Sequence, residues 1–429
     1  MKNKLIFIEL NEINFDLVKK YSLNYSFKVF NNEFFKKLKK TKSEDEYNLL
    51  EPWIQWVSIH TGLTAREHKI YRLGDFDGKK IPHIFRKIED KGFEVGAICP
   101  MNVTNDLKRS KYFIPDPWIK NQQPKNFFYK KIYNALSEAV NKNSGSQISF
   151  QSKFFILLSF VVFVRKKFLF KLSSLVFKSL RNKWQKALIF DFLLNEIHIK
   201  LFKKYKIDFS TIFFNAGAHI QHHYLNNSNV INNTKNPEWY VKKSIDPILE
   251  TYIFYDEIIN EYLKMKNISL LMATGLTQKP YDKSKFYYRL SNHQKFMEII
   301  DIDYESIEPR MSRDFLVKFK NSHYSNTLEN KLLKINELNQ NKFFDIDNRG
   351  NDVFVTLTYP KEIHKGFKLK INDNLVIDFS EHVNFVAIKN GEHSPNGYLF
   401  SKGSIENLIN TNNFHVKEIY NIINNYFKK

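Results

Sequence analysis

Short apolar runs that end at polar residues constrain the fold of this chain more than any other feature. They are typical of buried strands and comprise Leu5–Leu10, Phe93–Cys99, Thr211–Phe214 and Ile268–Met272. Two segments with helical features, Trp53–Thr61 and Ile81–Gly92, separate the first two runs. This alternation predicts an α/β fold with a mostly parallel central sheet and helices on both faces.

The 429 residues are predicted to form one α/β core that carries a helical insertion. Residues 1–126 are the N-terminal part of this core, residues 127–206 the insertion, and residues 207–429 the C-terminal part of the same core. From Val353 to Phe400, β-branched residues become denser and Gly and Asn turns appear. This stretch predicts additional strands that complete the sheet.

The insertion combines bulky apolar residues with recurring Lys and Arg. Its apolar run Phe154–Val164 is about half of the roughly 20 residues that span a bilayer, so a transmembrane helix is not expected. Two interpretations remain. The segment either packs on the main sheet as a helical hairpin, or lies in an anionic membrane interface with Phe160 and Phe163 in the lipid.

Charge and cysteine content narrow the partners and the compartment. Sixty-six Lys and Arg against 45 Asp and Glu give a net charge of +21, which favours phosphate-rich partners or anionic lipid. An AT-rich coding bias toward Lys, Asn, Ile and Phe explains the same excess. No RNA-binding signature or zinc-finger spacing is present, so nucleic acid is not an expected partner.

The single cysteine, Cys99, excludes an internal disulfide and suits a reducing compartment. The apolar run before Glu9 has only four residues, too few for the core of a signal peptide. The chain is therefore expected in the cytoplasm, at the inner membrane face if the insertion contacts lipid.

Three motifs combine histidines with other polar residues: Glu51–Gly62, Asn215–His219 and Gly391–Gly397. Their order and rough spacing resemble the alkaline phosphatase superfamily, most closely its type I phosphodiesterase/nucleotide pyrophosphatase branch. The resemblance implies an alkaline-phosphatase-like fold and a phosphate-linked substrate. It also implies a site in which two metal ions flank a Thr or Ser nucleophile.

Several positions that the resemblance makes functional carry unsuitable residues. The nucleophile would fall at Pro52, which has no hydroxyl, and the Asp-His-Gly of one metal site is replaced by Ala273-Thr274-Gly275. Glu9 stands where the family has its N-terminal Asp, and Asn215 replaces a second Asp. His219 and His393 are in place.

No firmly bound cofactor is therefore predicted. If one divalent ion is bound, the ligands implied by the resemblance are Asn215, His219 and His393. Without an ion, the two histidines would donate hydrogen bonds to a phosphate or act as acid or base.

The candidate residues fall into two groups. The predicted catalytic residues are Glu9, Glu51 and His393. The predicted substrate-binding residues are Gln55, Asn215, His219, His222, Thr274 and Gln278. Glu9, Asn215 and Thr274 each lie at or just after a strand end, where ligands bind in doubly wound sheets.

Three functions remain open from the sequence. The favoured one is a metal-independent transferase in surface-glycan assembly, which uses a nucleotide- or lipid-linked sugar and Glu9 or Glu51 as general base. The second is a one-metal phosphodiesterase or pyrophosphatase. The third is a non-catalytic protein that binds a phosphorylated ligand.

Overall fold

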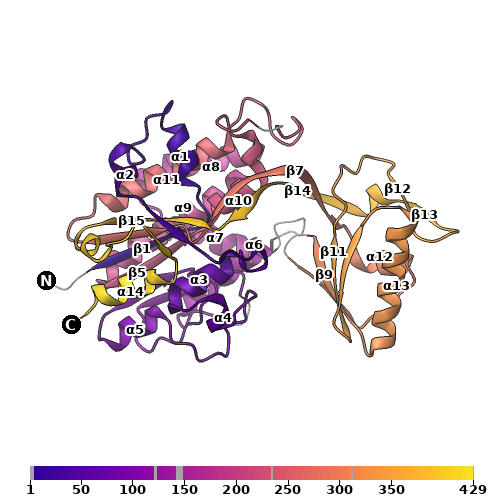
Figure 1. Ribbon diagram of the computed structural model, residues 1–429, viewed down its shortest axis with the longest axis horizontal. Coiled ribbons are helices and arrows are strands. Elements are labelled where there is room, and N and C mark those ends of the chain that lie inside the picture. The colour runs from indigo at the N-terminus through magenta and orange to yellow at the C-terminus, as the bar shows by residue number, and fades with distance from the viewer. Residues whose placement is uncertain (1–3, 120–122, 142–147, 233–234, 311–312, 429) are drawn as a thin grey trace. The chain divides into compact units, whose positions relative to one another are not determined.

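The computed structural model describes residues 4–119, 123–141, 148–232, 235–310 and 313–428, which form two units (Figure 1). The core unit consists of Met1–Glu138, Ser149–Pro280 and Gly391–Lys429, and the inserted unit of Ala139–Ile148 and Tyr281–Asn390. The prediction that residues 207–429 continue a single core is therefore wrong for residues 281–390.

An eight-stranded sheet in the order β16-β2-β15-β6-β1-β5-β3-β4 forms the centre of the core unit. Its strands are β1 (Leu5–Leu10), β2 (Lys39–Lys42), β3 (Val95–Ile98), β4 (Tyr112–Ile114), β5 (Phe209–Phe214), β6 (Ser269–Ala273), β15 (Asn396–Lys402) and β16 (Asn413–His415). Strand β1 is parallel to β5 and β6, whereas β15 is antiparallel to β6 and β2. The predicted α/β class with a mostly parallel sheet is confirmed.

Helices cover both faces of this sheet (Figure 1). On one side lie α3 (Pro52–Thr61), α4 (Ala65–His68), α5 (Ile84–Asp90) and α14 (Glu418–Tyr426). On the other lie α9 (Gln185–Tyr205), α10 (Ala216–Tyr224) and α11 (Pro247–Leu263). Phe85 of α5 stacks on Phe209 of β5, and Tyr255 of α11 contacts Phe214, so successive β5 residues face opposite layers.

The remaining elements of the core unit are short helices and the predicted helical segment. They are α1 (Phe15–Tyr21), α2 (Asn32–Lys37), α6 (Phe127–Asn141), α7 (Phe150–Phe163), α8 (Leu169–Arg181), and the 3-10 turns η1 (Tyr47–Leu49), η2 (Lys166–Phe168), η3 (Leu225–Asn227) and η5 (Ser404–Leu408). Helices α7 and α8 pack on α9, which itself packs on β5 and is largely buried. Among the described residues, no helix has the length and apolarity needed to cross a bilayer.

The inserted unit has its own apolar core and a four-stranded antiparallel sheet in the order β10-β11-β9-β8. Its elements are β8 (Ser306–Pro309), β9 (Asp314–Lys318), β10 (Phe344–Asn348), β11 (Asp352–Leu357), β12 (Lys368–Lys370), β13 (Val376–Asp378), η4 (Phe379–Glu381), α12 (His293–Ile299) and α13 (Ser322–Leu338). Strands β7 (Thr277–Leu290) and β14 (Val383–Ser394) pair with each other, and the chain leaves and re-enters the core unit through them.

Candidate functional site

Glu12, His222 and His393 meet at the carboxyl end of the central strands. The Nε2 atom of His222 lies 3.1 Å from Oε2 of Glu12, and Nε2 of His393 lies 3.2 Å from the same oxygen. The two Nε2 atoms are 3.2 Å apart. Glu12 is buried, whereas the His222 and His393 side chains are 29% and 15% exposed, so the cluster is open to solvent on the histidine side.

The backbone holds Glu12 in place immediately after β1. Its φ of 61° lies in the left-handed region, which is uncommon for a residue with a side chain of this size. Its N–H donates to the carbonyl of Thr274 at 3.0 Å, and its carbonyl accepts from Nε2 of Gln221 at 2.7 Å. These contacts from the end of β6 and from α10 stabilise a conformation that the residue would otherwise avoid.

Helix α10 brings His222 to the cluster, and a buried carboxylate anchors its start. Asp191 accepts hydrogen bonds from the backbone N–H of Ala216 at 2.9 Å and from the Tyr255 hydroxyl at 2.6 Å. Burial raises the pKa of Asp191 to about 7, although these hydrogen bonds act in the opposite direction. The helix also packs very closely on the loop after Glu12, because a Cβ at Gly217 would lie 2.2 Å from Cδ1 of Ile13.

The Glu12 carboxylate receives hydrogen bonds on both oxygens. Asn11 Nδ2 donates to Oε1 at 3.0 Å, and Gln278 Nε2 donates to Oε2 at 2.6 Å. Burial opposes ionisation of Glu12, but the positive charges and hydrogen bonds of His393 and His222 outweigh it and hold the pKa well below its usual range. Glu12 is thus a carboxylate at neutral pH.

Contacts on the other side of the His393 ring fix its orientation. Its Nδ1 lies 3.7 Å from Oε2 of Glu51, and the ring also hydrogen-bonds with the backbone of Leu50. Burial lowers the pKa of His393, but Glu12 and, more weakly, Glu51 outweigh burial, so the pKa lies above its ordinary value. A ring held through Nδ1 directs Nε2 toward the cluster, as outer contacts do for metal-bound histidines.

The cluster fits a divalent metal ion. Donor atoms around a tetrahedral zinc ion at about 2.0 to 2.1 Å are about 3.3 Å apart. The three atoms here are 3.1 to 3.2 Å apart. Two His and one Glu are also a ligand set of catalytic zinc sites that leave one position open. Among the described residues, no other group of three His, Cys, Asp or Glu has this spacing.

Four of the residues predicted from the sequence take part in the cluster or contact it. His393 and His222 are two of its three members, Gln278 donates to Glu12, and Glu51 lies beside His393. Asn215 lies at its edge, where its Oδ1 accepts from Asn11 Nδ2 at 2.8 Å. The predicted ion ligands, Asn215, His219 and His393, therefore share only His393 with the observed set.

The other predicted binding residues have different surroundings. His219 lies one turn before His222, and burial, followed by the charge of His222, lowers its pKa to about 4. The Thr274 hydroxyl accepts from the Tyr398 N–H at 2.9 Å. Gln55 is fully buried and donates to the carbonyl of Leu49 at 2.6 Å. Thr274 therefore contacts strand β15, and Gln55 contacts the turn η1.

The structure does not bring Glu9 into the cluster. Side chains alternate along β1, and that of Glu9 points to the layer of α3, where it is fully buried. Its Oε1 lies 3.1 Å from Nε2 of His60 and accepts from the Thr211 hydroxyl at 2.5 Å. The carboxylate that meets His393 is Glu12, three residues later.

Sequence reasoning missed Glu12, Asn11 and Gln221. Asn11 and Glu12 directly follow the first apolar run, where the polar residues of a parallel sheet gather. Their position after the first strand could have identified them as candidate site residues. Gln221 offers none, because it is one of several polar residues on α10 and its role depends on the loop that it braces.

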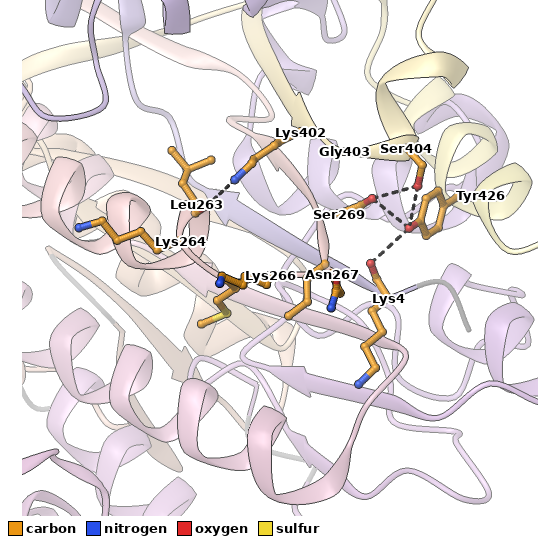
Figure 2. Close-up of a pocket in the computed structure, with 12 residues that line it drawn as sticks. Lys4, Leu263, Lys264, Lys266, Asn267, Ser269, Lys402, Gly403, Ser404 and Tyr426 are labelled. Atoms are coloured by element: carbon orange, nitrogen blue, oxygen red, sulfur yellow. Dashed lines mark hydrogen bonds between the residues drawn. The ribbon is translucent and has the colours of Figure 1, made fainter. Parts of the chain in front are cut away.

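A hollow of about 600 Å³ lies at the opposite edge of the same sheet, away from the cluster (Figure 2). Lys4 precedes β1, Ser269 begins β6, and Lys402 ends the antiparallel β15, so the hollow is at the amino ends of the parallel strands. The Tyr426 hydroxyl donates to Ser269 Oγ at 3.0 Å, and Lys402 donates to the carbonyl of Leu263. Ligands of open α/β sheets bind at the other edge, where Glu12 lies.

No family model matches this chain, and no curated protein matches its sequence. It is similar to solved structures over nearly its whole length. Murine ectonucleotide pyrophosphatase/phosphodiesterase 5 in complex with AMP is 11% identical, with a TM-score of 0.41 and coverage of 99% of this chain and 95% of the other. Phosphonoacetate hydrolase from Sinorhizobium meliloti in complex with phosphonoformate is 9% identical, with a TM-score of 0.44 and coverage of 99% and 96%.

Alkaline phosphatase from the Antarctic bacterium TAB5 is 8% identical, with a TM-score of 0.40 and coverage of 99% and 98%. Similarity at this level assigns no role to any residue of the chain. The three structures come from the superfamily that the sequence motifs resemble.

Proposed function

We propose that this chain is a hydrolase that cleaves a phosphate-linked small molecule at a single divalent ion held by Glu12, His222 and His393. The convergence of these three donor atoms, 3.1 to 3.2 Å apart, carries the proposal. The substrate class comes from the resemblance of the sequence motifs to phosphodiesterases.

In this proposal some residues bind the ion or the substrate, and others orient the residues that do. Glu12 supplies the negative charge that a ligand set with a neutral Asn215 lacks. Glu51 and the Leu50 backbone orient His393. An ion held by Glu12, His222 and His393 would supply polarisation of a phosphoryl oxygen and activation of water for attack. His219 is neutral at pH 7 and lies one turn from His222, so it can hydrogen-bond a phosphate without adding charge.

Hydrolysis replaces metal-independent transfer as the favoured reaction because three donor atoms converge as ion ligands and because Glu9 is out of reach. The transferase hypothesis used Glu9 or Glu51 as the base that accepts a proton from an acceptor hydroxyl. Glu9 is fully buried between His60 and Thr211, so an acceptor cannot reach it. Glu51 is 35% exposed beside His393, where it can accept a proton from water in a hydrolytic reaction.

The test is a metal-dependence assay on the purified chain. Protein stripped with a chelator is mixed with Zn²⁺, Mn²⁺ or Mg²⁺ and with a phosphodiester, a phosphomonoester or a nucleotide-linked sugar. We expect product release only with metal, and a rate at least about 10²-fold lower in Glu12→Gln, since a ligand contributes more than an outer-shell contact. His364→Ala is the matched control, because that histidine is 75% exposed in the inserted unit.

Turnover that persists after chelation and in Glu12→Gln would refute the proposal. Adding an acceptor alcohol separates the two reaction types. If more of the donor is transferred to the alcohol than is hydrolysed, the transferase is favoured, with the same cluster holding the donor.

A further inference from the structure

Helix α7 exposes a continuous line of large apolar side chains. Phe150, Phe154, Leu157 and Val161 are 86%, 52%, 64% and 75% exposed. Their spacing of four, three and four residues places them in one stripe along the helix. The opposite side of α7 packs inward, where Phe163 is 4% exposed and stacks against Phe128.

Helix α8 follows after the short turn η2 and carries a second stripe. Its exposed apolar side chains are Leu169, Phe170, Val176, Phe177 and Leu180. Leu175, on its other side, is buried in the core. Of the 20 large apolar side chains that are exposed in the described part of the chain, nine lie in these two helices. The concentration marks an interaction surface, because single exposed apolar residues are ordinary whereas a large patch is not.

The same segment is strongly and uniformly basic. Residues 149–186 contain nine Lys and Arg and no Asp or Glu. Four of the nine, Arg165, Lys167, Lys171 and Lys178, form ion pairs with Glu residues outside the segment. The other five, Lys153, Lys166, Arg181, Lys183 and Lys186, are exposed. An apolar stripe flanked by cations complements a surface that is apolar inside and anionic at its boundary.

We propose that α7 and α8 form a docking surface that lies in the plane of a bilayer containing anionic lipid. The two stripes enter the boundary between headgroups and acyl chains, and the exposed cations contact lipid phosphates. The helices have 14 and 13 residues, so they lie on the membrane without crossing it.

The structure also corrects which phenylalanines take part. The sequence predicted lipid contact for Phe160 and Phe163. Phe163 is buried, and Phe160 is partly buried against the core, so Asp at these positions would disturb folding. The lipid-facing residues are Phe154, Leu157 and Val161 instead.

The experiment is co-sedimentation of the full chain with vesicles of phosphatidylcholine alone or mixed with phosphatidylglycerol. We expect binding to the mixed vesicles, weaker binding as salt rises, and little binding to phosphatidylcholine. Leu157→Asp combined with Val161→Asp should reduce binding by at least about 10-fold, since each change removes apolar burial and adds a repelled charge. The control pair is Leu23→Asp with Leu333→Asp, which are 80% and 50% exposed elsewhere.

A second measurement reports insertion directly. Phe170 is 86% exposed, so Phe170→Trp should be tolerated, and its emission should be quenched by brominated lipid in mixed vesicles. The proposal is overturned if the chain does not bind mixed vesicles at low salt. It is also overturned if the Leu157/Val161 and Leu23/Leu333 double variants weaken binding equally. It is also overturned if the chain dimerises without lipid and the Leu157/Val161 pair abolishes the dimer, because the stripes would then be a protein interface.

Discussion

His222 and His393 are 171 residues apart in the chain, yet their Nε2 atoms lie 3.2 Å apart and share one oxygen of Glu12. Without an ion, the Glu12 carboxylate offsets the repulsion between two imidazolium rings so close together. If both rings lost these protons, their Nε2 atoms and the carboxylate would form a site for a shared cation. Helix α10 and strand β14 thus each place one histidine beside Glu12.

We expect the purified chain to bind one divalent ion with these three ligands. His222→Ala and His393→Ala should each lower Zn²⁺ affinity by more than the about 10 to 100-fold typical of an outer-shell change. Isothermal titration of chelator-treated protein measures the stoichiometry and the affinity, and His364→Ala should behave as the wild type. Two tightly bound ions per chain, or unchanged affinity in both variants, would contradict the assignment.

The two carboxylates near the end of β1 should respond differently to amide substitution. Glu12→Gln should abolish tight metal binding, whereas Glu9→Gln should retain it, because the Glu9 side chain hydrogen-bonds with the buried His60 and Thr211, away from the cluster. Glu9→Ala removes the partner of His60 Nε2, whereas the Thr211 hydroxyl keeps the carbonyl of Phe7 at 3.0 Å, and the change should cost about 1 to 3 kcal/mol of unfolding free energy. If Glu9→Gln lost metal binding while circular dichroism showed an intact fold, Glu9 would have to be counted among the residues of the site.

Gly391 should not tolerate a side chain. A Cβ at this position would lie 2.2 Å from Oε1 of Gln278 and 3.0 Å from the carbonyl of Gln221. Gly391→Ala should therefore cost about 1 to 3 kcal/mol by overpacking, and should also weaken metal binding because Gln278 supports Glu12. Glu392→Ala, which removes an ion pair with the exposed Lys279, is the control. Equal denaturation midpoints for the two variants would argue against the close packing.

Buried His198 should make the core unit less stable in acid. Its ring nitrogens lie 2.8 Å from the hydroxyls of Tyr262 and Ser210, and burial lowers its pKa from 6.5 to about 3. Between these values the unfolded chain binds a proton that the folded chain does not. The unfolding free energy therefore falls as pH falls through this window, by up to about 1.4 kcal/mol per pH unit.

Denaturant titrations of the wild type and His198→Gln at about pH 5 and about pH 7 measure this contribution. The variant should be less stable at both pH values, and its stability should change less between them. His364→Ala should keep the wild-type pH dependence. An identical pH dependence in all three proteins would exclude His198 as a source of acid sensitivity.

The sequence predicted the central strands from their short apolar runs. It predicted His393 from the resemblance to the superfamily, His222 as a residue one helical turn beyond His219, and Gln278 because it follows a strand. It did not distinguish Glu9 from Glu12. Side chains alternate between the two faces of β1, and that of Glu9 faces α3. Glu12 reaches the cluster in a left-handed backbone conformation that hydrogen bonds with Thr274 and Gln221 stabilise.

The inserted unit was missed for a related reason. Residues 353–400 contain strands of four different sheets, and these strands carry similar apolar residues. Val353 pairs with Val317 in one sheet, whereas Phe400 pairs with Met272 in another. The local sequence of a strand does not indicate which distant strand it pairs with.

The position of β15 has a consequence for how the protein is made. Strand β2, completed by Lys42, has only β15 and β16 as neighbours in the sheet, and β15 begins at Asn396. A nascent chain must therefore keep β2 unpaired, and the edge of β6 open, until β15 has left the ribosome. His393 emerges just before β15, so the cluster is assembled at the same stage, long after Glu12 and His222 have been made. Nascent chains should need chaperone protection until then, and any ion should be acquired only afterwards.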